Sequence, residues 1–135
     1  MRDAKRPASP ELRKIGAGLL SWRLAKMDVE GDWSCHSIGA TALRDAGAKL
    51  AELEKLTWAE ATARASARMT RIPTPKLPPK ARRRLEQLKL DDFGELYEIR
   101  VAGKPRIWGV REEPVFYFLW WDPNHEVYPA RLRNT

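Results

Sequence analysis

Polar and apolar residues alternate in the last third of the chain, where three short runs rich in aromatic and β-branched residues follow one another. The first run, 95–101, has bulky residues at every second position, namely Tyr97, Ile99 and Val101. Glu98 and Arg100 fall between them, and this period of two is typical of a strand with one face in the core.

The second and third runs, 106–111 and 115–121, are separated from their neighbours by turn residues that include glycine or proline. The run 115–121 is apolar at every position, so both of its faces should be covered, and Phe118 at its middle should be the centre of the core. These runs predict an antiparallel β-meander, to which residues 126–128 add a short last strand.

The first half of the chain predicts one strand, a hairpin and two helices. Residues 19–29 alternate as a strand does, and 33–36 read as a short return strand after a turn. Apolar residues then recur at helical spacing over 37–56. Thr57 and Glu60 form a capping-box pattern, which predicts a second helix over 57–69.

A proline-rich stretch, 72–79, predicts an extended linker, and a third helix should follow over 79–89 with Pro79 in its first turn. The resulting fold class is α+β, with three helices packed on one face of a small antiparallel sheet. Residues 1–11 are charged and contain two prolines, so we expect a flexible basic arm, followed by a single domain over 12–135.

Composition narrows the classes of function. The net charge of +7 favours polyanionic partners such as RNA, DNA or an acidic protein. The single cysteine, Cys35, excludes a disulfide within the chain and suits a reducing cytoplasm. The chain has neither a run of about 20 apolar residues nor an apolar signal segment, so we expect no membrane contact and a cytoplasmic location.

Residues 79–129 resemble the RelE/ParE-like toxin superfamily. The resemblance lies in a basic helix followed by strands that read ELYEIRV, PRIWGVR and VFYFLWW. It implies a RelE-like sheet flanked by helices, cleavage of mRNA without a metal or cofactor, a ribosome-associated target in some members, and an antitoxin partner. Arg100 and Arg106 match the strand arginines of the family, and His125 follows the last long strand, where some members place an acid–base residue.

Chemistry points to the same residues. Cleavage of RNA through its own 2′-oxygen needs a proton acceptor, a proton donor and cations for the extra charge on phosphorus. Arginine presents a fixed fork of donors to phosphate oxygens, and Arg100, Arg106 and Arg111 stand on the meander strands. The alternative is that these arginines only pair with neighbouring acids such as Glu98, Glu112 and Glu113.

His125 is a candidate general acid or base, because histidine titrates near neutral pH and this one lies in a turn at a sheet end. Its alternative role is a turn histidine bonded to the backbone. In a simple meander Arg100, Arg106 and His125 converge at one end of the sheet, and Arg111 lies at the other. Asp122 and His125 lack the further ligands that a metal needs, so we expect no metal site.

Nucleic-acid contacts are expected from basic residues outside the meander. Arg64, Arg68 and Arg71 share one face of the predicted second helix, and Arg82 and Arg83 belong to a basic cluster in the third. The alternative for each group is that its arginines only form a solvated surface and bind no partner. Tyr128 is the surface aromatic expected to stack on a base.

The sequence therefore supports two hypotheses. The first is a metal-independent RelE-like ribonuclease of the toxin type, in which Arg100, Arg106 and His125 carry the reaction. The alternative is a basic binding module without catalysis, for nucleic acid or an acidic protein partner.

Overall fold

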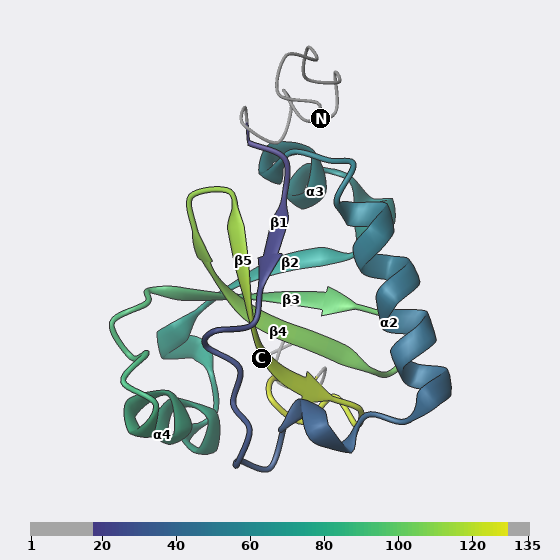
Figure 1. Ribbon diagram of the computed structural model, residues 1–135. Coiled ribbons are helices and arrows are strands. Elements are labelled where there is room, and N and C mark those ends of the chain that lie inside the picture. The colour runs from purple at the N-terminus through teal and green to yellow at the C-terminus, as the bar shows by residue number, and fades with distance from the viewer. Residues whose placement is uncertain (1–17, 130–135) are drawn as a thin grey trace, which may run out of the picture.

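The computed structural model of the protein describes residues 18–129 (Figure 1); the predicted arm at 1–11 lies outside this range. The strands are β1 (Ser21–Arg23), β2 (Met69–Pro73), β3 (Glu95–Arg100), β4 (Arg106–Glu112) and β5 (Val115–Asp122). The α-helices are α2 (Ala40–Leu53), α3 (Trp58–Ala63) and α4 (Pro79–Gln87). Single 3₁₀ turns occur at η2 (Cys35–Ser37), η3 (Ala65–Ala67) and η4 (Thr74–Lys76).

The strands form one five-stranded sheet in the order β1-β5-β4-β3-β2. Strands β3, β4 and β5 pair antiparallel in sequence order, so the predicted meander is confirmed. At the other edge β1 pairs parallel to β5, with Trp22 opposite Phe116. The expectation of a purely antiparallel sheet is therefore wrong. The rings of Trp22 and Phe116 contact edge to face, 5.1 Å between centroids, which favours this docking of β1.

Helices cover both faces of the sheet, whereas the sequence predicted all three helices on one face. Ala81 and Leu85 of α4 pack with Leu96 in one core cluster. Residues of α2 and α3 pack with Tyr97 in a second cluster. Because neighbouring residues of a strand point to opposite faces, α4 lies on one side of the sheet and α2 and α3 on the other (Figure 1).

The second helix is shorter than its pattern predicted. Its start is confirmed, because Thr57 and Glu60 form the expected capping box. Its end is not: Arg64 leaves the helical conformation and Arg68 adopts a left-handed one with φ 60°. Met69 then begins β2, which pairs with β3 and takes up the residues predicted as the start of the linker. Pairing with an open sheet edge satisfies backbone groups that a longer helix would have kept internal.

Two predicted short strands are absent from the described residues. Residues 33–36 instead include η2, which Ser34 caps by accepting a hydrogen bond from the backbone of His36. Residues 126–128 fold over the end of β5, because the backbone N–H groups of Glu126 and Val127 donate to the buried Asp122 carboxylate at 2.8 and 3.0 Å. In both places a side-chain acceptor competes with strand pairing for the backbone donors.

A β-bulge shifts the centre of the core along β5. The register slips between Trp108 and Gly109, so that Leu119 has no partner of its own on β4. Leu119 and Trp120 consequently share one core cluster, although they are neighbours in the chain. Phe116, Leu119 and Trp120 are fully buried, whereas Phe118, the predicted centre, is only half-buried.

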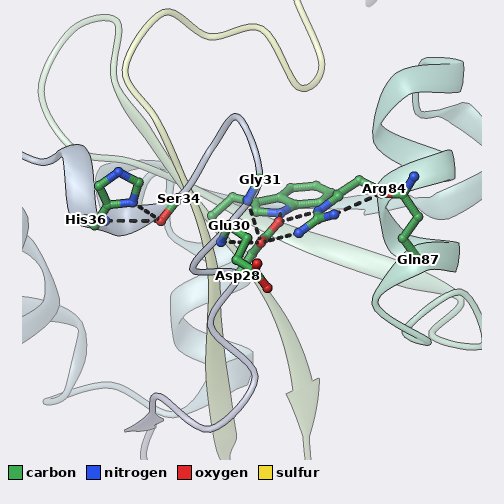
Figure 2. Close-up of polar contacts among 8 residues, drawn as sticks. Asp28, Glu30, Gly31, Ser34, His36, Arg84 and Gln87 are labelled. Atoms are coloured by element: carbon green, nitrogen blue, oxygen red, sulfur yellow. Dashed lines mark hydrogen bonds and ion pairs between the residues drawn. The ribbon is translucent and has the colours of Figure 1, made fainter.

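A buried carboxylate, that of Asp28, joins its loop to helix α4 and strand β5 (Figure 2). Asp28 is 1% exposed. Arg84 of α4 donates to both of its oxygens at 2.7 and 2.8 Å, and Trp120 Nε1 of β5 donates at 2.9 Å. The backbone N–H groups of Glu30 and Gly31 add two further bonds at 3.2 and 3.0 Å. Burial alone would raise the pKa of Asp28, but the donors, led by Arg84, outweigh it and hold that pKa well below its usual range.

Replacing Gly109 should destabilise the fold. A Cβ at this position would meet the Tyr117 carbonyl oxygen and the Phe116 ring. We expect Gly109→Ala to lower the free energy of unfolding by about 3 kcal/mol, as overpacking of a closed core does. Gly47→Ala is the matched control: its Cβ meets nothing within 4 Å in α2, so it should raise stability by about 0.5–1 kcal/mol. Urea denaturation measures both, and similar effects at the two positions would contradict the packing at Gly109.

Loss of the Asp28 carboxylate should have a pH-dependent cost. Asp28→Asn removes the buried carboxylate that pairs with the Arg84 guanidinium, so the free energy of unfolding at pH 7 should fall by about 3 kcal/mol or more. Because the folded pKa is depressed, this stabilisation is present above the unfolded value of about 3.9 and is lost as the pH falls below it.

The difference in free energy of unfolding between wild type and Asp28→Asn should therefore become smaller as the pH falls from about 4 to about 2. Denaturation at several pH values measures it. Asp45→Asn, at an exposed position of α2, should match wild type at each pH. A difference that stays constant down to pH 2 would show that Asp28 does not stabilise the fold as a carboxylate.

Candidate functional site

A cavity of about 330 Å³ lies where α3, η3, β2, β3 and β4 meet. We call it the arginine cavity, because four arginines line its walls: Arg64, Arg68, Arg100 and Arg106. The single acidic residue on the wall is Glu98. The cavity thus gathers a local positive excess that could hold an anionic group.

Local backbone geometry places the first two arginines. Arg64 caps the end of α3 and pairs with Glu60 at 3.0 Å. Arg68 ends η3 in a left-handed conformation, and its carbonyl accepts the backbone N–H of Arg100 at 3.0 Å. This bond joins the end of η3 to the end of β3. Arg64, Arg68 and Arg71 do not form the predicted helical stripe, because the helix ends before Arg68 and Arg71 lies in β2. Arg71 pairs there with Glu95 at 3.3 Å.

Glu98 is the centre of the site. It is 3% exposed, and its Oε2 lies 3.6 Å from Arg106 Nε and 3.3 Å from His125 Nε2. One carboxylate oxygen therefore joins the two residues that the sequence placed at the same end of the sheet. Their convergence is present in the structure; their catalytic roles stay predictions.

The turn between β3 and β4 orients the two strand arginines. Arg106 Nη1 donates to the carbonyl oxygens of Gly103, Lys104 and Pro105 at 2.7, 2.7 and 3.2 Å. Arg100 Nε donates to Gly103 O at 3.0 Å, and its side chain is exposed. Arg106 is 8% exposed and its ion pair with Glu98 matches the structural alternative, whereas Arg100 faces solvent at the cavity wall.

His125 lies in the turn after β5 with φ 56°, and its backbone N–H donates to Asp122 O at 3.4 Å. Asp122 is fully buried and also accepts from Trp108 Nε1 at 3.2 Å, so it holds the turn in place. Among residues 18–129 no group of three or more His, Cys, Asp and Glu side chains could hold a metal ion.

His125 also lines a second cavity of about 460 Å³, together with two lysines, Lys80 and Lys104. We call it the lysine cavity. His125 contacts Glu98, which lines the arginine cavity, so the imidazole lies between the two.

The remaining candidates lie elsewhere. Arg111 is at the opposite end of β4, as expected, with its guanidinium 4.5 Å from the centre of the Trp58 ring. Arg82 and Arg83 are exposed on α4 and line neither cavity. Tyr128 is 8% exposed and belongs to a core cluster, so its predicted surface position is wrong.

Sequence reasoning named Glu98 only as an ion-pair partner. The signal that could have identified it is its position, since a lone acid on the same strand face as Leu96 must be buried with a partner. Cys35 in η2 is partly buried. Burial, with a smaller contribution from the Asp28 charge, raises the pKa of this thiol to about 11, which leaves it neutral and a poor nucleophile at neutral pH.

Comparison with known proteins adds no further constraint. No protein-family model matches the chain, and searches of the curated proteins and of the solved structures gave no match. Between residues 18 and 129, no helix is both long and apolar enough to cross a membrane.

Proposed function

We propose that this chain is a metal-independent ribonuclease of the toxin type, with its active site at the Glu98–His125–Arg106 cluster. The observation that carries the proposal is the single Glu98 oxygen that joins an imidazole and a guanidinium at the edge of a cavity lined by arginines. Acid–base and phosphate-binding groups thereby meet without a metal ligand set.

Glu98 would orient the histidine. A neutral imidazole with its proton on Nε2, which lies 3.3 Å from Glu98 Oε2, has its lone pair on Nδ1, the nitrogen that can then accept a proton. The role is the one that a buried carboxylate plays toward histidine in hydrolases. Glu98 is therefore a positioning residue, and His125 is the catalytic one.

The reaction would proceed by attack of the RNA on itself. His125 removes the proton of a 2′-hydroxyl, the 2′-oxygen forms a bond to the adjacent phosphorus, and the bond from phosphorus to the 5′-oxygen breaks. The departing oxygen takes a proton from the imidazolium, which leaves a 2′,3′-cyclic phosphate and a 5′-hydroxyl. Arg100 and Arg106 would stabilise the extra negative charge on the phosphorane.

The proposal that the protein is a toxin rests on the resemblance of residues 79–129 to the RelE/ParE-like superfamily. By that resemblance the target is mRNA, either free or on the ribosome, and an antitoxin protein would hold the activity in check. A cytoplasmic location goes with this reading.

A second candidate function is a basic binding module without catalysis, for RNA or another polyanion. The observation that favours it is the burial of the cluster, because Arg106 already donates to three carbonyl oxygens and His125 Nε2 lies against Glu98. On this reading the buried groups only shape the arginine cavity, and the exposed Arg64, Arg68 and Arg100 contact phosphate.

Removal of the imidazole should separate these two functions. We expect purified wild-type protein to cleave single-stranded RNA in the presence of EDTA, and His125→Asn to cut it at least about 100-fold more slowly, the usual share of general acid–base catalysis. Asparagine tolerates the left-handed backbone at this position. His36→Asn is the matched control, because His36 is exposed and bonded to Ser34 outside both cavities.

Expression in a bacterium provides the second readout. Wild type and His36→Asn should arrest growth, whereas His125→Asn and Arg106→Ala should be tolerated. Equal RNA cleavage and equal growth arrest by wild type and a folded His125→Asn variant would remove the catalytic assignment and leave the binding module.

Salt dependence of binding tests the role of the arginine cavity under both functions. For a single strand, each phosphate contact contributes roughly −0.7 to the slope of log affinity against log salt. Replacing Arg64, Arg68 and Arg100 by Gln should therefore make the slope less negative by about 2. The same replacement of Arg82 and Arg83, which line neither cavity, should change it little. A flat salt dependence in wild type would remove nucleic acid as a partner.

A further inference from the structure

The lysine cavity has the character of a second phosphate site. Lys104 is exposed and has no acidic partner among the described residues. Lys80 donates a hydrogen bond to the Asp32 carboxylate 2.9 Å away, which raises the pKa of Lys80, so this ammonium stays charged. Glu126 is the only acid among the residues that line this cavity.

Lys80 is held in a defined place. Its ammonium lies 5.1 Å from the centre of the Trp33 ring. Trp33 is 3% exposed and packs against Trp120 of β5, with the ring centroids 4.9 Å apart and the planes tilted by 58°. A cation over a buried aromatic ring loses fewer conformations on binding an anion than a free surface lysine does. Lys80 is therefore a placed cation, and the exposed Lys104 lines the same cavity beside it.

The two cavities share a wall. Glu98 and Arg106 line the arginine cavity, while Lys104 and His125 line the lysine cavity. Glu98 contacts His125 at 3.3 Å, and Arg106 donates to the carbonyl of Lys104 at 2.7 Å. Cationic groups thus lie on both sides of the imidazole, with the Glu98 carboxylate between the two cavities.

We propose that one single-stranded RNA occupies both cavities and crosses His125 between them, with Lys80 and Lys104 holding a phosphate on the far side from the arginines. This inference rests on the proposed function and names its substrate class: RNA that extends beyond the scissile phosphate in both directions. A dinucleotide fills one cavity only, so it binds weakly and is cut slowly.

The test measures binding separately from cleavage, with 2′-O-methyl RNA, which lacks the attacking hydroxyl. Wild-type protein should bind a labelled octanucleotide much more tightly than a dinucleotide. Lys80→Gln/Lys104→Gln should bind the octanucleotide about tenfold or more weakly and the dinucleotide nearly as wild type does. Its salt slope for the octanucleotide should be less negative by about 0.7, for the loss of one phosphate contact.

The control is Lys55→Gln/Lys76→Gln, which removes the same charge from exposed residues outside both cavities. An equal loss in this control, or an equal loss of dinucleotide and octanucleotide binding in Lys80→Gln/Lys104→Gln, would overturn the second site.

The two proposals fail in different ways. Octanucleotide binding unchanged in Lys80→Gln/Lys104→Gln, with cleavage still dependent on His125, would overturn the two-cavity path and leave the ribonuclease standing. The expected length-dependent loss of binding in a protein that cleaves no RNA would uphold the path and overturn catalysis.

Discussion

The Asp28 carboxylate is the interaction on which the arrangement of the molecule most depends. Five donors from three separate parts of the chain meet on it: the guanidinium of Arg84, the indole of Trp120 and the backbone of its own loop. A buried charge of this kind is tolerated only when its donors are all in place. It therefore fixes α4 against β5 and the 28–34 loop against both, and with that loop it positions Trp33, beside which the lysine cavity opens.

One face of β3 shows how the core gives way to the site. Leu96 is fully buried beneath α4, Glu98 is buried but charged, and Arg100 is exposed at the cavity wall. The strand thus passes from apolar packing to solvent through a single carboxylate, which needs cationic or hydrogen-bonding partners at that depth. Arg106 and His125 meet this need. The same desolvated position that demands partners for structural reasons thus brings a guanidinium and an imidazole to one carboxylate oxygen.

The sequence predicted the antiparallel order of β3, β4 and β5, because the first of these runs has a clear period of two, the last is apolar throughout and the turns between the runs contain glycine or proline. It also located the start of α3, where Thr57 and Glu60 act within one helical turn. It misjudged features that depend on distant partners: the parallel pairing of β1, the strand β2 in place of a longer helix, and helices on both faces. Apolar spacing does not say which surface covers it. The convergence of Arg106 and His125 followed from strand order alone, whereas Glu98 between them was missed, since a strand acid is usually solvated.

The pairing of β1 with β5 sets an order of events for a nascent chain. Trp22 and its neighbours meet their partners only after Val115–Tyr117 of β5 have been synthesised, because the register joins these distant segments. Until then the Trp22 side chain of β1 has no native surface to cover it, and the Asp28 carboxylate in the loop behind it lacks its Trp120 donor. Contacts of such sequence separation form late and leave hydrophobic segments exposed to other chains in the meantime. Within residues 18–129 the sheet is therefore completed where its first strand in sequence meets its last.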